Sequence, residues 1–108
     1  MLVKIADNLA VASGASEYTV PMNMSGANAI QATGIGINLN GAASWTIVLQ
    51  GSLDNTNWTD IVTWASLVAG NNYPTKQTGI GFALVRCKVT SVTGGPTICT
   101  IYLNSSAQ

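Results

Sequence analysis

The sequence contains no histidine and very few charged side chains. Of its 108 residues, four are Lys or Arg and four are Asp or Glu, which amounts to 7% of the chain and a net charge of zero. An average globular chain has about 25% charged residues. Histidine is the commonest general base and the commonest metal ligand, so its absence disfavours catalysis and metal binding. Four cations offset by four anions release few counterions from a phosphate backbone, so nucleic acid is not an expected partner.

Long apolar runs and paired cysteines are also missing. No stretch approaches the roughly 18 apolar residues of a membrane-spanning helix, so we expect no membrane partner. The chain begins with MLVKIADN, which has no apolar run before a cleavage site and predicts synthesis without a signal peptide. Cys87 and Cys99 are too few for a disulfide scaffold and lack the spacing of a zinc site. We therefore expect no metal and no cofactor.

The residues that are present predict a folded, all-β protein. Apolar residues make up 47% of the chain, which is too many for a disordered one. A chain of this length forms a single domain, over residues 1–108. Polar and apolar residues alternate over Ser44–Gln50, so that Trp45, Ile47 and Leu49 share one face of a strand. Such segments recur with turn residues between them, which predicts a small antiparallel β-sandwich or barrel of roughly six to eight strands.

The N-terminal residues 1–13 are expected to form a strand-like arm. They carry few charges, and a strand at a chain end can pair with the edge of a sheet in a neighbouring molecule. Leu67–Gln77 contains a run of turn residues and is predicted to be a loop. Further strands are expected at Leu2–Ile5, Asn8–Ala12, Tyr18–Val20, Ala29–Asn40 and Trp58–Trp64.

The C-terminal part of the sequence is typical of a β-hairpin. Its two strands are Gly81–Thr90 and Thr97–Leu103, joined by a turn around Thr93–Pro96. In this register Cys87 lies opposite Cys99 on the buried face, at a separation that is compatible with a disulfide. Two buried free thiols are the other interpretation, which the lack of an export signal favours.

The loop that follows Ser44–Gln50 is a candidate contact site. Asp54, Asn55 and Asn57 form side-chain turns and tolerate left-handed backbone, which predicts a hairpin loop. Their oxygen atoms can face a cation, but a single carboxylate is too little charge for calcium. Asp54 and Asp60 are expected as a turn residue and a solvated strand residue rather than as a catalytic pair. No catalytic residue is therefore predicted.

Aromatic and apolar side chains provide the other candidate contacts. Trp45 and Trp58 occupy alternating strand positions and are expected in the core, whereas Trp64 is expected to reach the surface. Exposed aromatic rings anchor partner proteins and stack on sugars. The outward face of the C-terminal hairpin is more apolar than a solvated face needs to be, so either a second sheet or another subunit covers it. The proposed contacts of this group are Trp64, Tyr73, Phe82, Leu84 and Tyr102.

Two segments of the sequence resemble small structural proteins of tailed bacteriophage virions. They are residues 46–61, TIVLQGSLDNTNWTDI, and residues 83–95, ALVRCKVTSVTGG. Such proteins often carry a GS-x-D-G-x-x-W hairpin and a late R-x-x-V-T strand before a glycine turn, and Asn55 stands here in place of the first motif's second glycine. In size and composition, the chain is most similar to head-decoration or capsid-stabilising proteins.

The resemblance implies a non-enzymatic virion protein that decorates or stabilises a phage capsid through multivalent protein–protein contacts. Its implied partners are its own copies, in a symmetric homo-oligomer such as a trimer, and a major capsid protein. Its implied location is the virion, after synthesis in the host cytoplasm. A similar hairpin occurs in discoidin-like β-sandwiches, so the alternative is a glycan-binding module of a phage tail or a secreted protein. That module would use Trp64, Tyr73 and the loop over residues 54–57.

Overall fold

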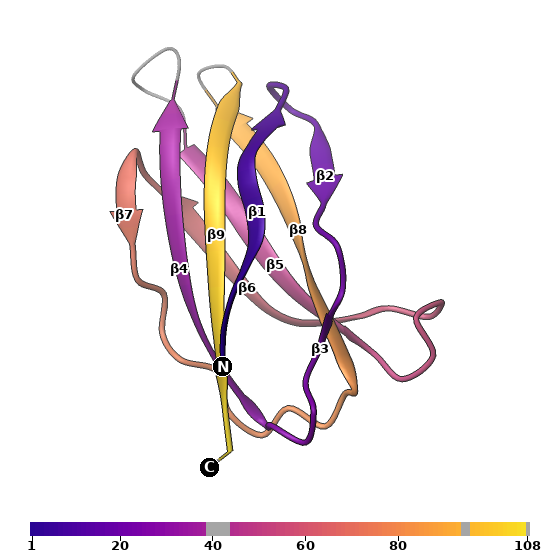
Figure 1. The fold of residues 1–108 in the computed structure, drawn as a ribbon. Helices are drawn as coiled ribbons and strands as arrows, with labels where there is room; N and C mark the ends of the chain where they lie inside the picture. Colours follow the sequence, from indigo (N-terminus) through magenta and orange to yellow (C-terminus); the bar gives the residue numbers. More distant parts are fainter. Residues whose placement is uncertain (39–43, 94–95, 108) are drawn as a thin grey trace.

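The chain folds into two antiparallel β-sheets that pack face to face (Figure 1). The structure is a computed structural model that describes residues 1–38, 44–93 and 96–107. Within these residues there are nine strands and no helix. The all-β sandwich predicted from the sequence is confirmed, with one strand more than expected.

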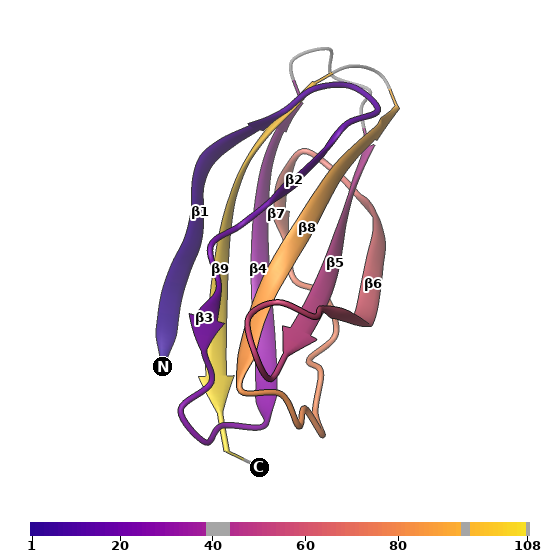
Figure 2. The same ribbon diagram turned by 90° about the vertical axis from the view of Figure 1, so that its right-hand side faces the viewer.

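The described residues place four strands in one sheet, sheet A, and five in the other, sheet B. The order in sheet A is β1 (Leu2–Val11), β9 (Thr97–Ser106), β4 (Ala29–Asn38) and β7 (Gly70–Asn72). The order in sheet B is β2 (Ser16–Tyr18), β8 (Leu84–Thr93), β5 (Ser44–Ser52) and β6 (Thr59–Leu67), and β3 (Met22–Asn23) also pairs with β8. Figure 2 shows β1, β9 and β4 in one layer and β8, β5 and β6 in the other.

The core lies between the two sheets and follows from the alternation of residues along the strands. Trp45, Ile47 and Leu49 of β5 are fully buried, as the sequence predicts. In β8 and β9, buried residues alternate with half-buried ones in the same way. The inward side chains of β8 and β9 belong to the same hydrophobic core as those of β5. They include Val85, Cys87, Val89, Cys99, Ile101 and Leu103.

Two glycines of β4 make room for the largest buried side chain. A Cβ atom on Gly34 would lie 2.8 Å from the ring of Trp45, and one on Gly36 would lie 2.6 Å from it. The indole Nε1 atom donates a hydrogen bond to the carbonyl oxygen of Val68 at 3.0 Å, so the polar atom of the buried ring is satisfied. Glycine at these two positions therefore lets sheet A close over a tryptophan that belongs to sheet B.

The predicted C-terminal hairpin is wrong, because β8 and β9 lie in different sheets. β9 pairs with β1 and β4, whereas β8 pairs with β5. Alternation identifies which side chains point inward, but it does not identify the neighbouring strand. Cys87 and Cys99 consequently belong to opposite layers of the core, and both are free thiols. The turn expected around Thr93–Pro96 includes residues 94 and 95, which lie outside the described residues.

The N-terminal segment is part of sheet A and not a free arm. Residues 2–11 form β1, which pairs with β9 from one end to the other. Its side chains Ile5, Ala6 and Val11 are buried in the core. A segment that completes the core of its own molecule does not extend freely from it, although β1 lies at the edge of sheet A. The segment expected as a strand-like arm over residues 1–13 thus forms a strand of its own sheet, and its contact with a neighbouring molecule stays a prediction.

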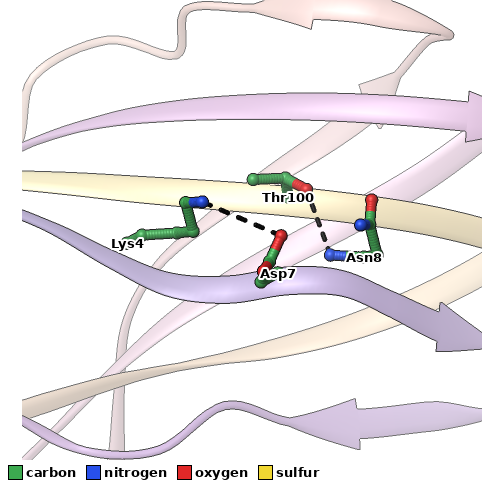
Figure 3. A network of polar contacts seen from close by, with 4 residues as sticks. All are labelled: Lys4, Asp7, Asn8 and Thr100. Atoms are coloured by element: carbon green, nitrogen blue, oxygen red, sulfur yellow. Dashed lines mark hydrogen bonds and ion pairs between the residues drawn. The ribbon is translucent and has the colours of Figure 1, made fainter.

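β1 is irregular in the middle, where its register against β9 shifts. Asn8 has a positive φ of 51°, and its amide donates a hydrogen bond to Thr100 Oγ1 at 3.1 Å (Figure 3). Just before Asn8 in the same strand, Asp7 forms an ion pair with Lys4, with 3.8 Å between Lys4 Nζ and Asp7 Oδ1. Bulges and charged side chains on an edge strand disfavour the addition of a further strand. This edge of sheet A is thus protected against edge-to-edge pairing.

Several predicted segment boundaries differ from the structure. The two expected strands Leu2–Ile5 and Asn8–Ala12 are one continuous strand, β1. The strand expected over Ala29–Asn40 is β4, and residues 39 and 40 lie outside the described residues. The segment Leu67–Gln77, expected as a loop, contains the short strand β7, which pairs with β4.

Candidate functional site

The β5–β6 loop projects from one side of the sandwich and is held by its own hydrogen bonds (Figure 1). Ser52 Oγ accepts hydrogen bonds from the amides of Asp54 and Asn55, at 3.2 and 2.9 Å, and donates one to Asp54 Oδ1 at 3.0 Å. Asp54 Oδ1 also accepts from the amides of Thr56 and Asn57, at 2.9 and 2.8 Å. Asn55 has a positive φ of 61°, a conformation that asparagine tolerates. The turn predicted from these residue types is therefore confirmed.

The hydrogen bonds of the loop keep Asp54 ionised. The backbone amides of Asn57 and Thr56 donate to its carboxylate, as do the side chains of Asn57 and Ser52, and together they hold its pKa well below the usual range. The Asn57 side chain bonds Asp54 Oδ2 at 2.7 Å. A carboxylate with so low a pKa is a poor proton donor at neutral pH. Its role in a site is that of a fixed negative charge and hydrogen-bond acceptor.

An open hollow of about 220 Å³ lies beside this loop. Its lining residues are Leu53, Asp54, Asn57, Thr59 and Phe82. Three of them, Asp54, Asn57 and Phe82, are contact residues predicted from the sequence, and the structure brings them together. The ring of Phe82 covers Gly51, where an added Cβ would lie 2.4 Å from the ring. A second hollow of about 370 Å³ shares Leu53 and Phe82 with the first, so the two are adjacent.

On the outer face of sheet B, Arg86 of β8 lies over two aromatic rings. Its guanidinium carbon is 4.3 Å from the centroid of the Tyr18 ring and 4.2 Å from that of the Trp58 ring. Arg86 Nε donates to Gln50 Oε1 at 2.9 Å, and Gln50 Nε2 donates to Asp60 Oδ1 at 2.8 Å. Gln50 is buried, so one well-fixed amide orients both the cation and the carboxylate. We call these five residues the Arg86 cluster.

Trp58 and Trp64 exchange the places predicted for them. Trp64 is only 8% exposed and packs in the core, whereas Trp58 is half-buried on the outer face of sheet B. The cause is an extra residue in β6, Ile61, between the partners of Leu49 and Gln50 in β5. An extra residue reverses the alternation of faces along a strand, so Trp58 before it points outward and Trp64, six positions later, points inward.

The remaining predicted contacts are dispersed over the molecule. Tyr73 follows β7 and is 69% exposed. Leu84 is half-buried at the start of β8, and Phe82 lies in the hollow. Tyr102 belongs to β9 of the other sheet, where Lys4 Nζ lies 5.7 Å from its ring centroid. Phe82, Leu84 and Tyr102 therefore do not form the common face that the predicted hairpin required.

Tyr18, Gln50 and Arg86 are not among the site residues predicted from the sequence. The available signal is the alternation of Arg86 and Lys88 on one strand, which places two cations on the same face. Their aromatic neighbours come from segments about 30 and 70 residues away in the sequence, at Trp58 and Tyr18. Contacts of that range depend on the strand order, which the sequence pattern does not determine.

The outer face of sheet A is uncharged over its two central strands. β4 and β9 contain no charged residue. One of its side chains, Ile37, is 54% exposed. The charges of this sheet come from β1, as Lys4 and Asp7. We call six of the outward side chains of β4 and β9 the neutral face: Thr33, Ile35, Ile37, Ile98, Thr100 and Tyr102.

The two thiols are unreactive at neutral pH. Burial raises the pKa of both Cys87 and Cys99 to about 12, and for Cys87 the neighbouring Cys99 adds to the effect. The thiolate is the reactive and metal-binding form of cysteine, and it is scarcely populated at such a pKa. Over residues 1–38, 44–93 and 96–107, no group of three or more His, Cys, Asp or Glu is placed to hold a metal ion. The same residues include no helix long and apolar enough to cross a membrane.

Solved structures share this fold, although no protein family and no curated protein matches the sequence. The PBSX exported protein XepA superposes with a TM-score of 0.77 at 10% identity, over 100% of this chain and 37% of that one. The SPBc2 prophage-derived protein YomS superposes with a TM-score of 0.57 at 15% identity, over 96% of this chain and 92% of that one. The chain thus spans little more than a third of XepA and nearly all of YomS. At these identities, the likeness establishes a common β-sandwich fold.

Proposed function

We propose that the protein is a non-enzymatic structural component of a bacteriophage virion. Residues 46–61 and 83–95 resemble segments of tailed-phage structural proteins. One of the solved structures with the same fold is described as prophage-derived, and it has nearly the same length as this chain. The sequence resemblance and the shared fold support the same assignment from independent directions.

The neutral face supports a more specific proposal, namely that the protein decorates or stabilises a phage capsid. Covering the part of this face that lies away from Lys4, which sits over the Tyr102 ring, removes no charge from water and escapes the large desolvation penalty of charged groups. Its occupants are other copies of the chain, in a symmetric oligomer such as a trimer, and the major capsid protein. Many copies acting together convert weak contacts into stable attachment. The protein is then a virion component made in the host cytoplasm.

Reconstitution of particles tests this proposal. Virions of the encoding phage that lack this protein are mixed with the purified chain and sedimented, and the bound copies are counted against concentration. We expect saturable binding that Ile37→Lys weakens by about tenfold or more, because a buried unpaired charge costs several kcal/mol. Thr63→Lys, on the exposed part of β6 in sheet B, is the matched control and should bind normally. Absence of wild-type binding contradicts the capsid role, and equal effects of the two variants contradict the neutral face.

The hollow beside the β5–β6 loop favours a second function, saccharide binding. Asp54 and Asn57 present a carboxylate and an amide next to the ring of Phe82, and sugar sites combine such polar groups with an aromatic surface. Of the glycan contacts predicted from the sequence, Trp64 is buried and cannot take part. Chemical-shift changes at the loop on addition of oligosaccharides test this function. A panel of neutral and acidic oligosaccharides that shifts no loop signal contradicts it.

A further inference from the structure

Two of the four cations of this nearly uncharged chain lie side by side on β8. Arg86 and Lys88 alternate on its outer face. By contrast, Lys4 is paired with Asp7 on β1, and Lys76 lies in the segment between β7 and β8. Among the described residues, no carboxylate oxygen lies within 4.0 Å of the side-chain nitrogens of Arg86 or Lys88. Arg86 and Lys88 therefore lack a direct carboxylate partner on the outer face of sheet B, where Gln50 links Arg86 to Asp60.

The guanidinium group of Arg86 is held in one orientation, and its two Nη atoms have no hydrogen-bond acceptor among the described residues. Contacts with the rings of Tyr18 and Trp58 and the bond from Nε to Gln50 fix its plane. A guanidinium fixed in this way loses little side-chain entropy when it binds, and its planar fork matches a carboxylate through two parallel hydrogen bonds.

We propose that the Arg86 cluster binds the carboxylate group of an acidic saccharide, that is, a sugar chain containing uronic acid. Arg86 receives the carboxylate on its free edge, and Lys88 adds positive charge along the same strand. The cluster is close to the hollow along the chain, because Trp58 stands between Asn57 and Thr59, which line the hollow. Thr59 and its partner Gly51 face the opposite side of sheet B from Gln50 and Asp60, so a sugar chain that contacts both places passes around the edge of the sheet at β6. The inference rests on the saccharide-binding function and adds the chemical class of the ligand.

The carboxylates near Arg86 favour a saccharide over an acidic peptide. Asp60 belongs to the cluster and Asp54 lines the hollow. Both can accept hydrogen bonds from sugar hydroxyls, which an uronic acid carries beside its single carboxylate. Ionised Asp or Glu side chains of a peptide only accept hydrogen bonds, so they offer no donor to Asp54 and Asp60. A uronic acid thus satisfies groups of both signs on this surface.

Calorimetric titration with trigalacturonate and with its methyl ester tests the proposal, because esterification removes the negative charges of the carboxylates and leaves the sugar rings unchanged. In a buffer containing a chelator of divalent cations, we expect the acid to bind about tenfold more tightly than the ester, the effect of a charge-assisted bidentate contact. Arg86→Gln should remove that preference. Arg86→Lys should also weaken binding of the acid, because an ammonium group does not reproduce the fork. Lys76→Gln removes the same charge elsewhere and is the matched control. Thermal unfolding verifies that each variant is folded.

Each outcome of the titration has one interpretation. Preference for the acid that is lost in Arg86→Gln and kept in Lys76→Gln supports the proposal. Equal binding of acid and ester overturns the proposal but leaves saccharide binding intact. If Arg86→Gln and Lys76→Gln lose the preference for the acid equally, the proposal is also overturned, because the preference then depends on the net charge of the protein and not on the Arg86 cluster. Binding of poly-glutamate without trigalacturonate overturns it in favour of an acidic protein partner. If neither sugar probe binds and the oligosaccharide panel is also silent, both the proposal and the saccharide function fail.

Discussion

The outer faces of the two sheets differ in chemistry, although strands of the same alternating pattern build both. Sheet A presents Thr, Ile and Tyr side chains from β4 and β9, without a charge. Sheet B presents Arg86 over two aromatic rings, with Lys88 beside it and Asp60 in the same hydrogen-bonded row. The inner faces have to fill one core and are alike. The outer faces have no such common requirement, and their difference agrees with the two roles proposed for them, protein contact for sheet A and ligand contact for sheet B.

The largest expected effect separates the edges of the two sheets. β1 at the edge of sheet A buries Ile5, Ala6 and Val11, whereas the three residues of β2 at the edge of sheet B are all exposed. Burial of an Ile or Val side chain contributes about 1.5–3 kcal/mol, and a whole domain is stable by only about 5–15 kcal/mol. Deletion of residues 1–13 should therefore prevent folding, as measured by circular dichroism and urea denaturation.

The control for this deletion keeps the backbone of β1 and removes its outward side chains. Replacing Leu2, Lys4 and Asp7 together by Ser should leave the chain folded, because all three are exposed. A folded protein after deletion of residues 1–13 would show that β1 is dispensable and would restore the interpretation of this segment as an arm.

The second prediction compares close glycines in the two sheets. A Cβ on Gly36 of β4 would meet the buried Trp45 ring at 2.6 Å and the carbonyl oxygen of Val68 at 3.0 Å, and neither can move away. A Cβ on Gly51 of β5 would meet the Cγ and Cβ atoms of Phe82 at 2.4 and 2.8 Å, but Phe82 is half-buried in the segment between β7 and β8, which can shift toward solvent with its backbone. Overpacking costs about 1–3 kcal/mol, so we expect Gly36→Ala near the upper end of that range and Gly51→Ala near the lower end.

Urea denaturation of the alanine variants measures this difference. Gly81→Ala is the matched control, because nothing lies within 4 Å of an added Cβ there, and its cost should be small. Equal costs at Gly36 and Gly51, or a larger cost at Gly51, would show that Trp45 is not confined between the sheets as the structure indicates.

The sequence predicts the faces of the strands well and their partners poorly. Alternation in β5, β8 and β9 correctly separates inward from outward side chains, because burial selects apolar residues at every second position. The pairing of β8 with β5 rather than β9 depends on the whole sheet order. The same limit applies to the site. The turn chemistry of Asp54 is local and was predictable, whereas the bulge at Ile61 that turns Trp58 toward Arg86 has no recognisable sequence signal.

The third prediction compares the cation–ring contacts of the two outer faces. Arg86 lies 4.2 Å from the Trp58 ring centroid, whereas Lys4 lies 5.7 Å from that of Tyr102 and is also paired with Asp7. Double-mutant cycles on protein stability should give a coupling of about 1 kcal/mol for Arg86 with Trp58 and less than about 0.5 kcal/mol for Lys4 with Tyr102. A cycle cancels the loss of the Gln50 hydrogen bond that Arg86→Ala also causes. A larger coupling for the pair in sheet A would contradict a rigid guanidinium in sheet B.

The smallest effect on stability is expected at Asp54, in the loop that extends sheet B. Hydrogen bonds from Asn57, Thr56 and Ser52 depress its pKa in the folded protein. A depressed folded-state pKa gives a stabilising contribution that is present above the unfolded-state pKa, about 3.9 for Asp, and is lost as the pH falls through the folded-state value. The loop should therefore keep its conformation at pH values where an ordinary Asp is already protonated. Because the carboxylate is exposed, solvent screens it and global stability should change little.

An NMR titration of the Asp54 carboxyl carbon checks this expectation. In the wild type, its signal should still be moving at the acid end of the titration, below the range of an ordinary Asp. Ser52→Ala removes one donor and should move the midpoint upward, with only a small change in the urea midpoint. A normal midpoint for Asp54 in the wild type would mean that the loop hydrogen bonds do not persist in solution. The hollow would then have no fixed negative charge on its rim. The Arg86 cluster alone would then distinguish the surface of sheet B from that of sheet A.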